Sequence, residues 1–155
     1  LAPLIEQLIR PLELRASKPV HIQLTDETEP TEIDADPLHL KQMLENLLDN
    51  AVKYSGEEVH IDIRIRQTAN TTEIRVTDDG IGIAPSQQER IFERFYRIGN
   101  GDRHDVKGFG LGLSYAKDMA ERHGGNIHVE SREHHGSTFT LIIPFRHDTR
   151  ITGRR

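Results

Sequence analysis

The first residues whose side chains could take part in binding or catalysis lie on one predicted helix, between Asp36 and Tyr54. Asn46 and Asn50 are four positions apart, so they share a helix face, and Lys53 follows about one turn later. Asparagine is a poor residue inside a helix. Its amide oxygen, however, suits Mg²⁺, which prefers hard oxygen ligands alongside phosphate. The alternative is a pair of solvated side chains on an exposed face.

A second candidate is the stretch D-D-G-I-G at residues 78 to 82, directly after a predicted strand. Two alternate glycines let another group approach the backbone closely. A carboxylate at this strand end can accept a hydrogen bond from an amine such as the exocyclic N6 of adenine. An ordinary Asp-Gly turn is the competing interpretation.

A third candidate is G-F-G-L-G-L at residues 108 to 113, which opens a helix. Such a turn gathers backbone N–H groups and the positive end of the helix dipole around an anion, typically phosphate. The spacing differs from the dinucleotide-binding G-x-G-x-x-G pattern, and no strand leads directly into it. Taken alone, the glycines also fit a flexible loop.

The elements around these motifs follow from hydrophobic periodicity. We predict a helix over residues 2–17 that Pro11 kinks or divides, a strand near residues 20–24, and the helix 36–54 with Asp36 as N-cap. Strands at 59–65 and 74–76 form a hairpin, and a short helix covers residues 91–97. A helix at about 111–123 and two final strands complete an α+β, two-layer sandwich. Its mixed, mostly antiparallel sheet is covered by helices on one face.

Composition excludes several classes of protein. The net charge of −5 argues against nucleic-acid binding, and the absence of cysteine excludes disulfides and thiolate metal sites. No apolar run approaches the roughly 20 residues of a membrane span, and the N-terminus does not have the pattern of a signal peptide.

Together, the motifs resemble the ATP-binding domain shared by histidine kinases, DNA gyrase B, the heat-shock chaperone ATPase and mismatch-repair ATPases. M-L-E-N-L-L-D-N-A-V-K-Y is similar to the N box, V-T-D-D-G-I-G-I to the G1 box and G-F-G-L-G-L to the G2 box. I-F-E-R-F-Y-R resembles the F box, which is particular to histidine kinases. The resemblance implies the left-handed Bergerat-type ATP-binding fold over residues 18–146. Residues 1–17 would be a linker or helix remnant, and 147–155 a disordered tail.

The resemblance also implies roles for individual residues. Asn50 would be the Mg²⁺ ligand, with Asn46 beside the phosphates. Asp78 would bind the adenine amine, supported by the Ser137 hydroxyl through an ordered water. The nucleotide site would comprise Asn46, Asn50, Lys53, Tyr54, Asp78, Gly80, Ile81, Gly82, Arg94, Arg97, Lys107, Gly108, Gly110, Leu111, Gly112, Leu113 and Ser137. Arg97 and Lys107 are also compatible with exposed charges.

The residue at position 46 distinguishes two kinds of chemistry among the proteins that this sequence resembles. The hydrolysing members carry Glu at this position to activate water, and Asn cannot take up a proton at neutral pH. We therefore expect a kinase that uses ATP and Mg²⁺ and donates the γ-phosphoryl group to a histidine. An ATP-hydrolysing conformational machine and a non-catalytic nucleotide sensor are the alternatives.

None of the nine histidines lies in the sequence context of a kinase acceptor helix. We therefore expect the acceptor on a separate dimerisation domain of the same kinase, with a response-regulator receiver domain as the later partner. The chain itself would be monomeric and the full-length kinase a homodimer. The resemblance implies a cytoplasmic domain and leaves an inner-membrane anchor open. No His-x₃-His with supporting carboxylates occurs, so the sequence predicts no zinc site.

The segment from about Arg97 to Phe109 is a predicted ATP lid. It contains Gly99, Gly101 and Gly108, and Val106 is the only apolar side chain between Ile98 and Phe109. Little burial therefore offsets the entropy of fixing this backbone, at about 1–2 kcal/mol per residue. We expect it to be mobile without nucleotide and ordered by the triphosphate.

Overall fold

The computed structural model describes residues 1–29, 33, 35–96 and 112–144. The predicted lid and the predicted C-terminal tail lie outside these residues. The elements are α1 (Ala2–Arg15), β1 (Val20–Asp26), α2 (Pro37–Lys53), β2 (Val59–Gln67), β3 (Thr71–Asp78), the 3-10 turns η1 (Pro85–Gln87) and η2 (Arg90–Phe92), α3 (Gly112–Arg122), β4 (Asn126–Ser131) and β5 (Ser137–Pro144). Within the described ranges, no helix is long and apolar enough to cross a membrane.

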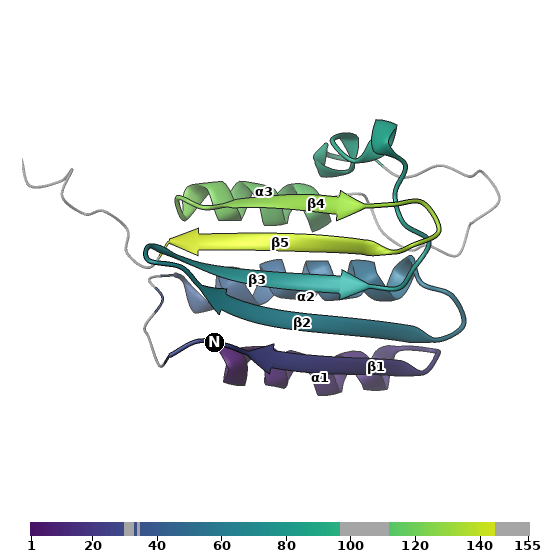
Figure 1. Cartoon of the computed structure of the whole chain (residues 1–155), viewed down its shortest axis with the longest axis horizontal. Coiled ribbons are helices and arrows are strands. Elements are labelled where there is room, and N and C mark those ends of the chain that lie inside the picture. Colours follow the sequence, from purple (N-terminus) through teal and green to yellow (C-terminus); the bar gives the residue numbers. More distant parts are fainter. Residues whose placement is uncertain (30–32, 34, 97–111, 145–155) are drawn as a thin grey trace, which may run out of the picture.

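The five strands form one sheet in the order β1-β2-β3-β5-β4. Strand β1 pairs with β2 in parallel, and the other neighbours are antiparallel. Figure 1 shows α1, α2 and α3 together on one face of this sheet. The predicted fold class, a two-layer sandwich with a mixed and mostly antiparallel sheet, is therefore confirmed.

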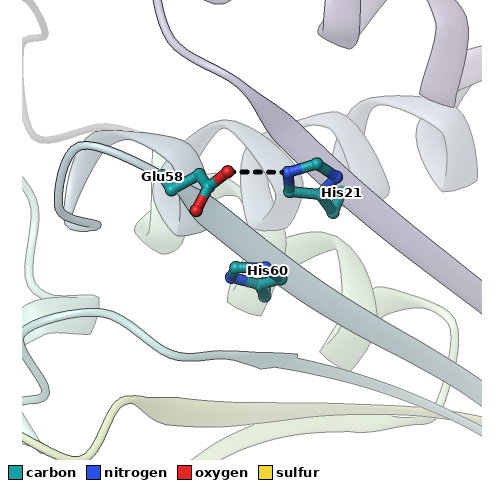
Figure 2. Close-up of side chains that lie close together, drawn as sticks. All are labelled: His21, Glu58 and His60. Atoms are coloured by element: carbon teal, nitrogen blue, oxygen red, sulfur yellow. Dashed lines mark hydrogen bonds and ion pairs between the residues drawn. The ribbon is translucent and has the colours of Figure 1, made fainter.

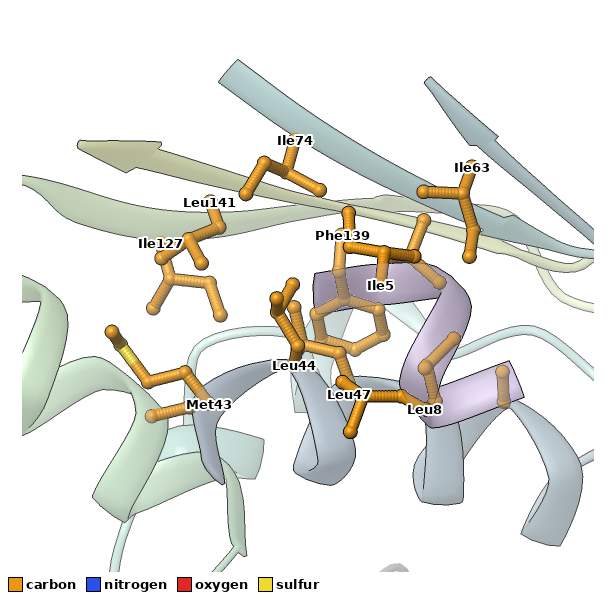
Figure 3. Close-up of a cluster of buried hydrophobic side chains, with 14 of the residues drawn as sticks. Ile5, Leu8, Met43, Leu44, Leu47, Ile63, Ile74, Ile127, Phe139 and Leu141 are labelled. Carbon is orange, nitrogen blue, oxygen red and sulfur yellow. The ribbon is translucent and has the colours of Figure 1, made fainter. Parts of the chain in front are cut away.

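Period-two alternation directs one row of side chains from each central strand toward the helices. The register places Ile63 beside Val76, and Ile74 beside Leu141. These side chains meet the apolar stripe of α2, as Figure 3 shows for Met43, Leu44 and Leu47. The core lies between the sheet and the helices, and the other face of the sheet carries mostly polar residues.

Helix α2 begins where its sequence predicts. The Asp36 carboxylate accepts hydrogen bonds from the backbone N–H groups of Leu38, at 2.9 Å, and His39, at 3.4 Å. These bonds lower the pKa of Asp36. The apolar stripe of this helix is buried and consists of Leu40, Met43, Leu44, Leu47, Leu48 and Ala51. Their burial fixes the rotation of α2 and therefore the direction in which its polar face points.

Helix α1 is continuous, and Pro11 does not divide it. Its residues Ile5, Leu8 and Leu12 are buried in the same core as the sheet and α2. The N-terminal segment therefore contributes to the core of the domain in this structure. Its predicted origin as a linker stays a prediction.

The predicted short helix over residues 91–97 is wrong. The helical part is only the 3-10 turn η2, because Glu93 is already extended, with φ −72° and ψ 143°. Phe95 has a left-handed φ of 63°, which cannot continue a right-handed helix. Ile91 is buried, and Phe92 packs edge-on against Phe139 at 6.3 Å between ring centroids. Packing onto the core, rather than helical periodicity, determines this segment.

The burial of α1 makes a stability prediction with an internal control. Leu8→Ala should lower the free energy of unfolding by about 2–5 kcal/mol, because Leu8 is 5% exposed and its loss leaves a cavity. Leu14→Ala on the same helix should change it by less than about 0.5 kcal/mol, because Leu14 is 78% exposed. Urea denaturation of both variants measures the difference. Equal, small effects would mean that α1 does not pack on the core.

Candidate functional site

One end of the sheet carries a row of polar side chains directed toward the helices. The register places Asp78 of β3 beside Ser137 of β5, and Ser137 beside Ser131 of β4. On the other side of Asp78 lies Ile61. The row occupies positions that hold apolar residues further along the same strands.

Asp78 is the buried acid of this row, with 8% of its surface exposed. Its carboxylate accepts the backbone N–H of Gly80 at 2.8 Å. Desolvation raises the pKa of Asp78 from 3.8 to about 6, although hydrogen bonds from the backbone of Gly80 and Ser137 act in the opposite direction. Because its folded pKa is raised, ionised Asp78 costs stability above about pH 6, and this cost disappears as the pH falls toward 3.8.

The D-D-G-I-G loop is attached to the C-terminal end of α2. The N–H of Ile81 donates to the carbonyl of Tyr54 at 2.9 Å. A Cβ on Gly80 would lie 2.2 Å from that same carbonyl oxygen, so only glycine allows this approach. The loop therefore joins Asp78 to the helix that carries Asn46, Asn50 and Lys53.

The other side of the loop is held by the β4–β5 hairpin. The Ser131 hydroxyl accepts the N–H of Ile83 at 2.8 Å and donates to the carbonyl of Gly136 at 2.9 Å. Because that bond uses the Ser131 proton, Ser137 is the donor in the 2.8 Å contact between the two hydroxyls. The Ser137 oxygen keeps a lone pair that a water molecule can use, as the predicted water-mediated role requires.

Asn46 and Asn50 are both half-buried on α2, and Lys53 is exposed at its end. Asn46 lies against the first residue of α3, since a Cβ on Gly112 would be 3.4 Å from its Oδ1. Helix α3 begins there, so its free N–H groups lie close to the asparagine face. Leu113, the next residue, is half-buried.

The remaining predicted residues are placed only in part. Arg94 is 73% exposed, and its guanidinium lies 4.0 Å from the carboxylate of Asp118 on α3. The structure therefore pairs Arg94 with α3. The other predicted phosphate contacts, Arg97, Lys107, Gly108, Gly110 and Leu111, lie outside the described residues.

A cavity of about 490 Å³ lies near the opposite end of the sheet, bordered by Asp26, Ile65 and Thr72. It contains none of the predicted nucleotide-binding residues. The candidate site is therefore defined by the polar row, the glycine loop and the facing ends of α2 and α3.

Comparison with known proteins gives a family for this arrangement. Residues 35–147 match the model of the histidine kinase-, DNA gyrase B- and HSP90-like ATPases. The chain belongs to this family. Sensor protein RprX of Bacteroides fragilis is 40% identical over 114 residues, 72% of this chain and 22% of RprX. Sensor histidine kinase WalK of Bacillus subtilis is 39% identical over 119 residues, 76% of this chain and 19% of WalK.

Solved histidine kinases have the same fold. The mycobacterial sensor histidine kinase MprB superposes with a TM-score of 0.81 at 27% identity, covering 94% of this chain and 95% of that one. Full-length ShkA, in complex with AMPPNP, gives 0.80 at 28% identity, covering 92% of this chain and 29% of ShkA. The chain is thus an ATP-binding catalytic domain of the sensor histidine kinase class. It spans about a fifth of the length of the curated relatives RprX and WalK.

Three residues that hold the candidate site together are not among the residues predicted from the sequence. Ser131 links the glycine loop to the hairpin, and Gln88 donates to the carbonyls of Ile83 and Ser131 at 3.0 and 2.9 Å. Gly136 has a φ of +81°, and a Cβ there would lie 2.0 Å from the carbonyl oxygen of Asp78. Only Gly136 had a sequence signal, as a glycine directly before Ser137. Ser131 is recognisable only from the strand register, and Gln88 only from the contacts that its side chain makes after η1.

Gly136 gives the second prediction. Gly136→Ala should lower the free energy of unfolding by more than about 1 kcal/mol, because the left-handed φ and the contact with Asp78 both exclude a side chain. The variant should also weaken ATP-analogue binding, because Asp78 must move. Gly56→Ala is the matched control, since a Cβ there meets nothing within 4 Å. If both variants unfolded at the same urea concentration and bound the analogue equally, the close approach would have no energetic role.

Proposed function

We propose that this domain binds Mg·ATP and donates the γ-phosphoryl group to a histidine on a separate domain of the same kinase. The observation that carries the proposal is the buried Asp78 carboxylate, joined by one glycine loop to the asparagine face of α2. An adenine site and a phosphate site would then be separated by a short, rigid connection. This spacing suits the two ends of one nucleotide.

Asp78 supports the adenine end of the proposal. An acid kept out of water at a cost to stability is expected where its charge has a use. Ionised Asp78 can accept from the N6 amine of adenine, whereas guanine presents a carbonyl oxygen at that position. Ser137, with its hydroxyl donating to Ser131, would accept from the water that contacts the base.

Asn50 and Asn46 support the phosphate end. The amide oxygen of Asn50 fits Mg²⁺, which commonly binds through one or two protein oxygens together with phosphates and water. When bound, Mg²⁺ would neutralise charge on the phosphate oxygens. Lys53 and Tyr54 would lie toward the phosphate and sugar, and Gly80, Ile81 and Gly82 would border the base. Arg94, Arg97, Lys107, Gly108, Gly110, Leu111, Gly112 and Leu113 would surround the triphosphate.

Asn46 favours transfer over hydrolysis, because an amide cannot remove a proton from water at neutral pH. In the proposed reaction, an imidazole nitrogen of the acceptor histidine attacks the γ-phosphorus. The bond from that phosphorus to the β–γ bridging oxygen breaks, and ADP leaves with the electron pair. The imidazole proton passes to a base outside this chain. The domain contributes positioning and charge neutralisation, as is general for phosphoryl transfer.

The wider context is part of the same proposal. The acceptor histidine would lie on a dimerisation domain, and the phosphoryl group would pass on to the receiver domain of a response regulator. The full-length kinase would be a homodimer with this domain in the cytoplasm. The net charge of −5 gives no support to nucleic-acid binding.

Asp78 yields a test of nucleotide choice. Wild type should bind ATP about ten- to a hundredfold more tightly than GTP, since a hydrogen bond to a charged group contributes about 1.5–3 kcal/mol. Asp78→Asn should reduce this preference, whereas Asp62→Asn, on the open face of the sheet, should retain it. Calorimetric titration with both nucleotides measures the ratio. Equal wild-type affinities for ATP and GTP would exclude Asp78 as the adenine acceptor.

The same carboxylate predicts a pH dependence. Its pKa is raised to about 6, so the free domain should take up a proton there as the pH falls. The affinity advantage of wild type over Asp78→Asn for ATP should then shrink by up to about tenfold per pH unit below 6. Phosphate titration affects both proteins alike and cancels in the ratio. A ratio that stays constant from about pH 7 to 5 would contradict the proposed role.

Asn50 yields the test of transfer. Asn50→Ala should abolish phosphoryl transfer to a kinase acceptor domain supplied in trans and weaken Mg-dependent ATP binding. The helix itself should persist, because Ala is the better helix former. Asn70→Ala, in the exposed β2–β3 turn, is the matched control and should transfer normally. An acid-labile phosphoprotein formed from γ-labelled ATP is the readout.

Further outcomes of that assay decide between the functions. The chain alone should give no labelled protein, because its own histidines lack the acceptor context. Phosphate release at the same rate with and without acceptor domains would favour the hydrolysing ATPase. ATP binding without transfer to any tested acceptor would favour the non-catalytic nucleotide sensor.

A further inference from the structure

Two histidines and a glutamate gather on the open face of the sheet. Figure 2 shows His21 on β1, His60 on β2 and Glu58 just before β2, all on the side away from the helices. One nitrogen of each ring and one carboxylate oxygen lie within 4.8 Å of one another. All three side chains are more than half exposed, so solvent ions reach them freely.

The parallel register between β1 and β2 creates this cluster. It pairs His21 directly with His60, and the two rings stack with centroids 4.9 Å apart and planes inclined by 20°. The Nε2 of His21 is 3.1 Å from an oxygen of Glu58. Two protonated imidazoles at this separation would repel each other, whereas two neutral ones can share a cation.

His60 is oriented by a second carboxylate. Its Nδ1 is 2.9 Å from one oxygen of Asp79, and its backbone N–H donates to the other at 3.1 Å. An imidazole that binds metal through one nitrogen commonly gives its other N–H to a carboxylate, which fixes the tautomer and the ring. Asp79 therefore leaves Nε2 of His60 as the nitrogen available to an ion.

We propose that His21, His60 and Glu58 bind a divalent transition-metal ion of the Zn²⁺ class. Two imidazole nitrogens and one carboxylate match the ligand sets of Zn²⁺ and its neighbours, while Mg²⁺ and Ca²⁺ prefer all-oxygen sites. Ligand atoms around tetrahedral zinc are about 3.4 Å apart, given metal–ligand distances near 2.1 Å. The 3.1 Å contact between His21 and Glu58 is already close to this value. Small rotations of exposed side chains would bring in His60, and water would complete the shell.

The competing explanation is a surface ion pair between His21 and Glu58, of the kind that contributes little to stability. An ion pair between His21 and Glu58 explains neither the stacking of His60 on His21 nor the contact of the Asp79 carboxylate with His60. The metal site does not depend on the proposed kinase function, because its ligands face away from the core side of Asp78. Binding measured without nucleotide or Mg²⁺ therefore tests it separately.

The test is calorimetric titration of the nucleotide-free 155-residue chain with Zn²⁺ at about pH 7.5, where imidazole ligands lose little to proton competition. We expect one Zn²⁺ per chain, and His21→Gln or His60→Gln should each lower its affinity at least about tenfold. His128→Gln is the matched control, since His128 is an exposed histidine on β4 outside the cluster. It should bind Zn²⁺ as wild type does.

Titration with Co²⁺ adds a structural readout, because its visible absorption reports coordination geometry. Wild type and His128→Gln should give the same band, and His60→Gln should lose it. Circular dichroism checks that each variant is folded. Equal Zn²⁺ affinity in His21→Gln, His60→Gln and wild type would overturn the proposal, as would the same loss in His128→Gln.

Discussion

The candidate site is arranged around the Asp78 carboxylate, which the fold keeps largely out of water. Asp78 lies at the end of the central strand β3, close to the backbone of Gly80 and Gly136, and the preceding inward-facing residues of β3 are the apolar Val76 and Ile74. Its desolvation raises its pKa to about 6, so the ionised form is a cost that the fold carries at neutral pH. The two glycines are required because a Cβ on Gly80 would lie 2.2 Å from the carbonyl oxygen of Tyr54, and one on Gly136 would lie 2.0 Å from that of Asp78. A carboxylate held in this way is ready for a hydrogen-bond donor such as the adenine amine.

The same loop that covers Asp78 connects the two halves of the site. Its backbone bonds to the end of α2 on one side and to the β4–β5 hairpin on the other. The core then fixes α2 through its apolar stripe, which turns Asn46 toward the start of α3. This arrangement is consistent with the ATPase family to which the chain and the histidine kinases belong. In the proposed function, the sheet would present the adenine acceptor and the helices would present the phosphate ligands.

Local patterns were sufficient for much of this fold. The capped helix α2, the alternating strands and the Asp78 motif could be predicted because each depends on residues near one another in the chain. The F-box segment could not, because Ile91 and Phe92 follow the core rather than helical periodicity. Ser131 and the His21–His60 pair were also inaccessible, since strand register alone brings their partners together. The sequence spacing of the histidines gave no sign of a metal site for the same reason.

The central claim, that a buried and ionisable Asp78 receives the adenine, is tested most directly by following its side-chain carboxyl carbon by NMR. A pH titration of the free domain should give a pKa of about 6 for this group. Saturating ATP should lower that pKa, because a hydrogen bond from the adenine amine favours the ionised form. Asp78→Asn identifies the signal by its absence. An ordinary carboxyl pKa near 3.8 that does not change when ATP binds would contradict the account.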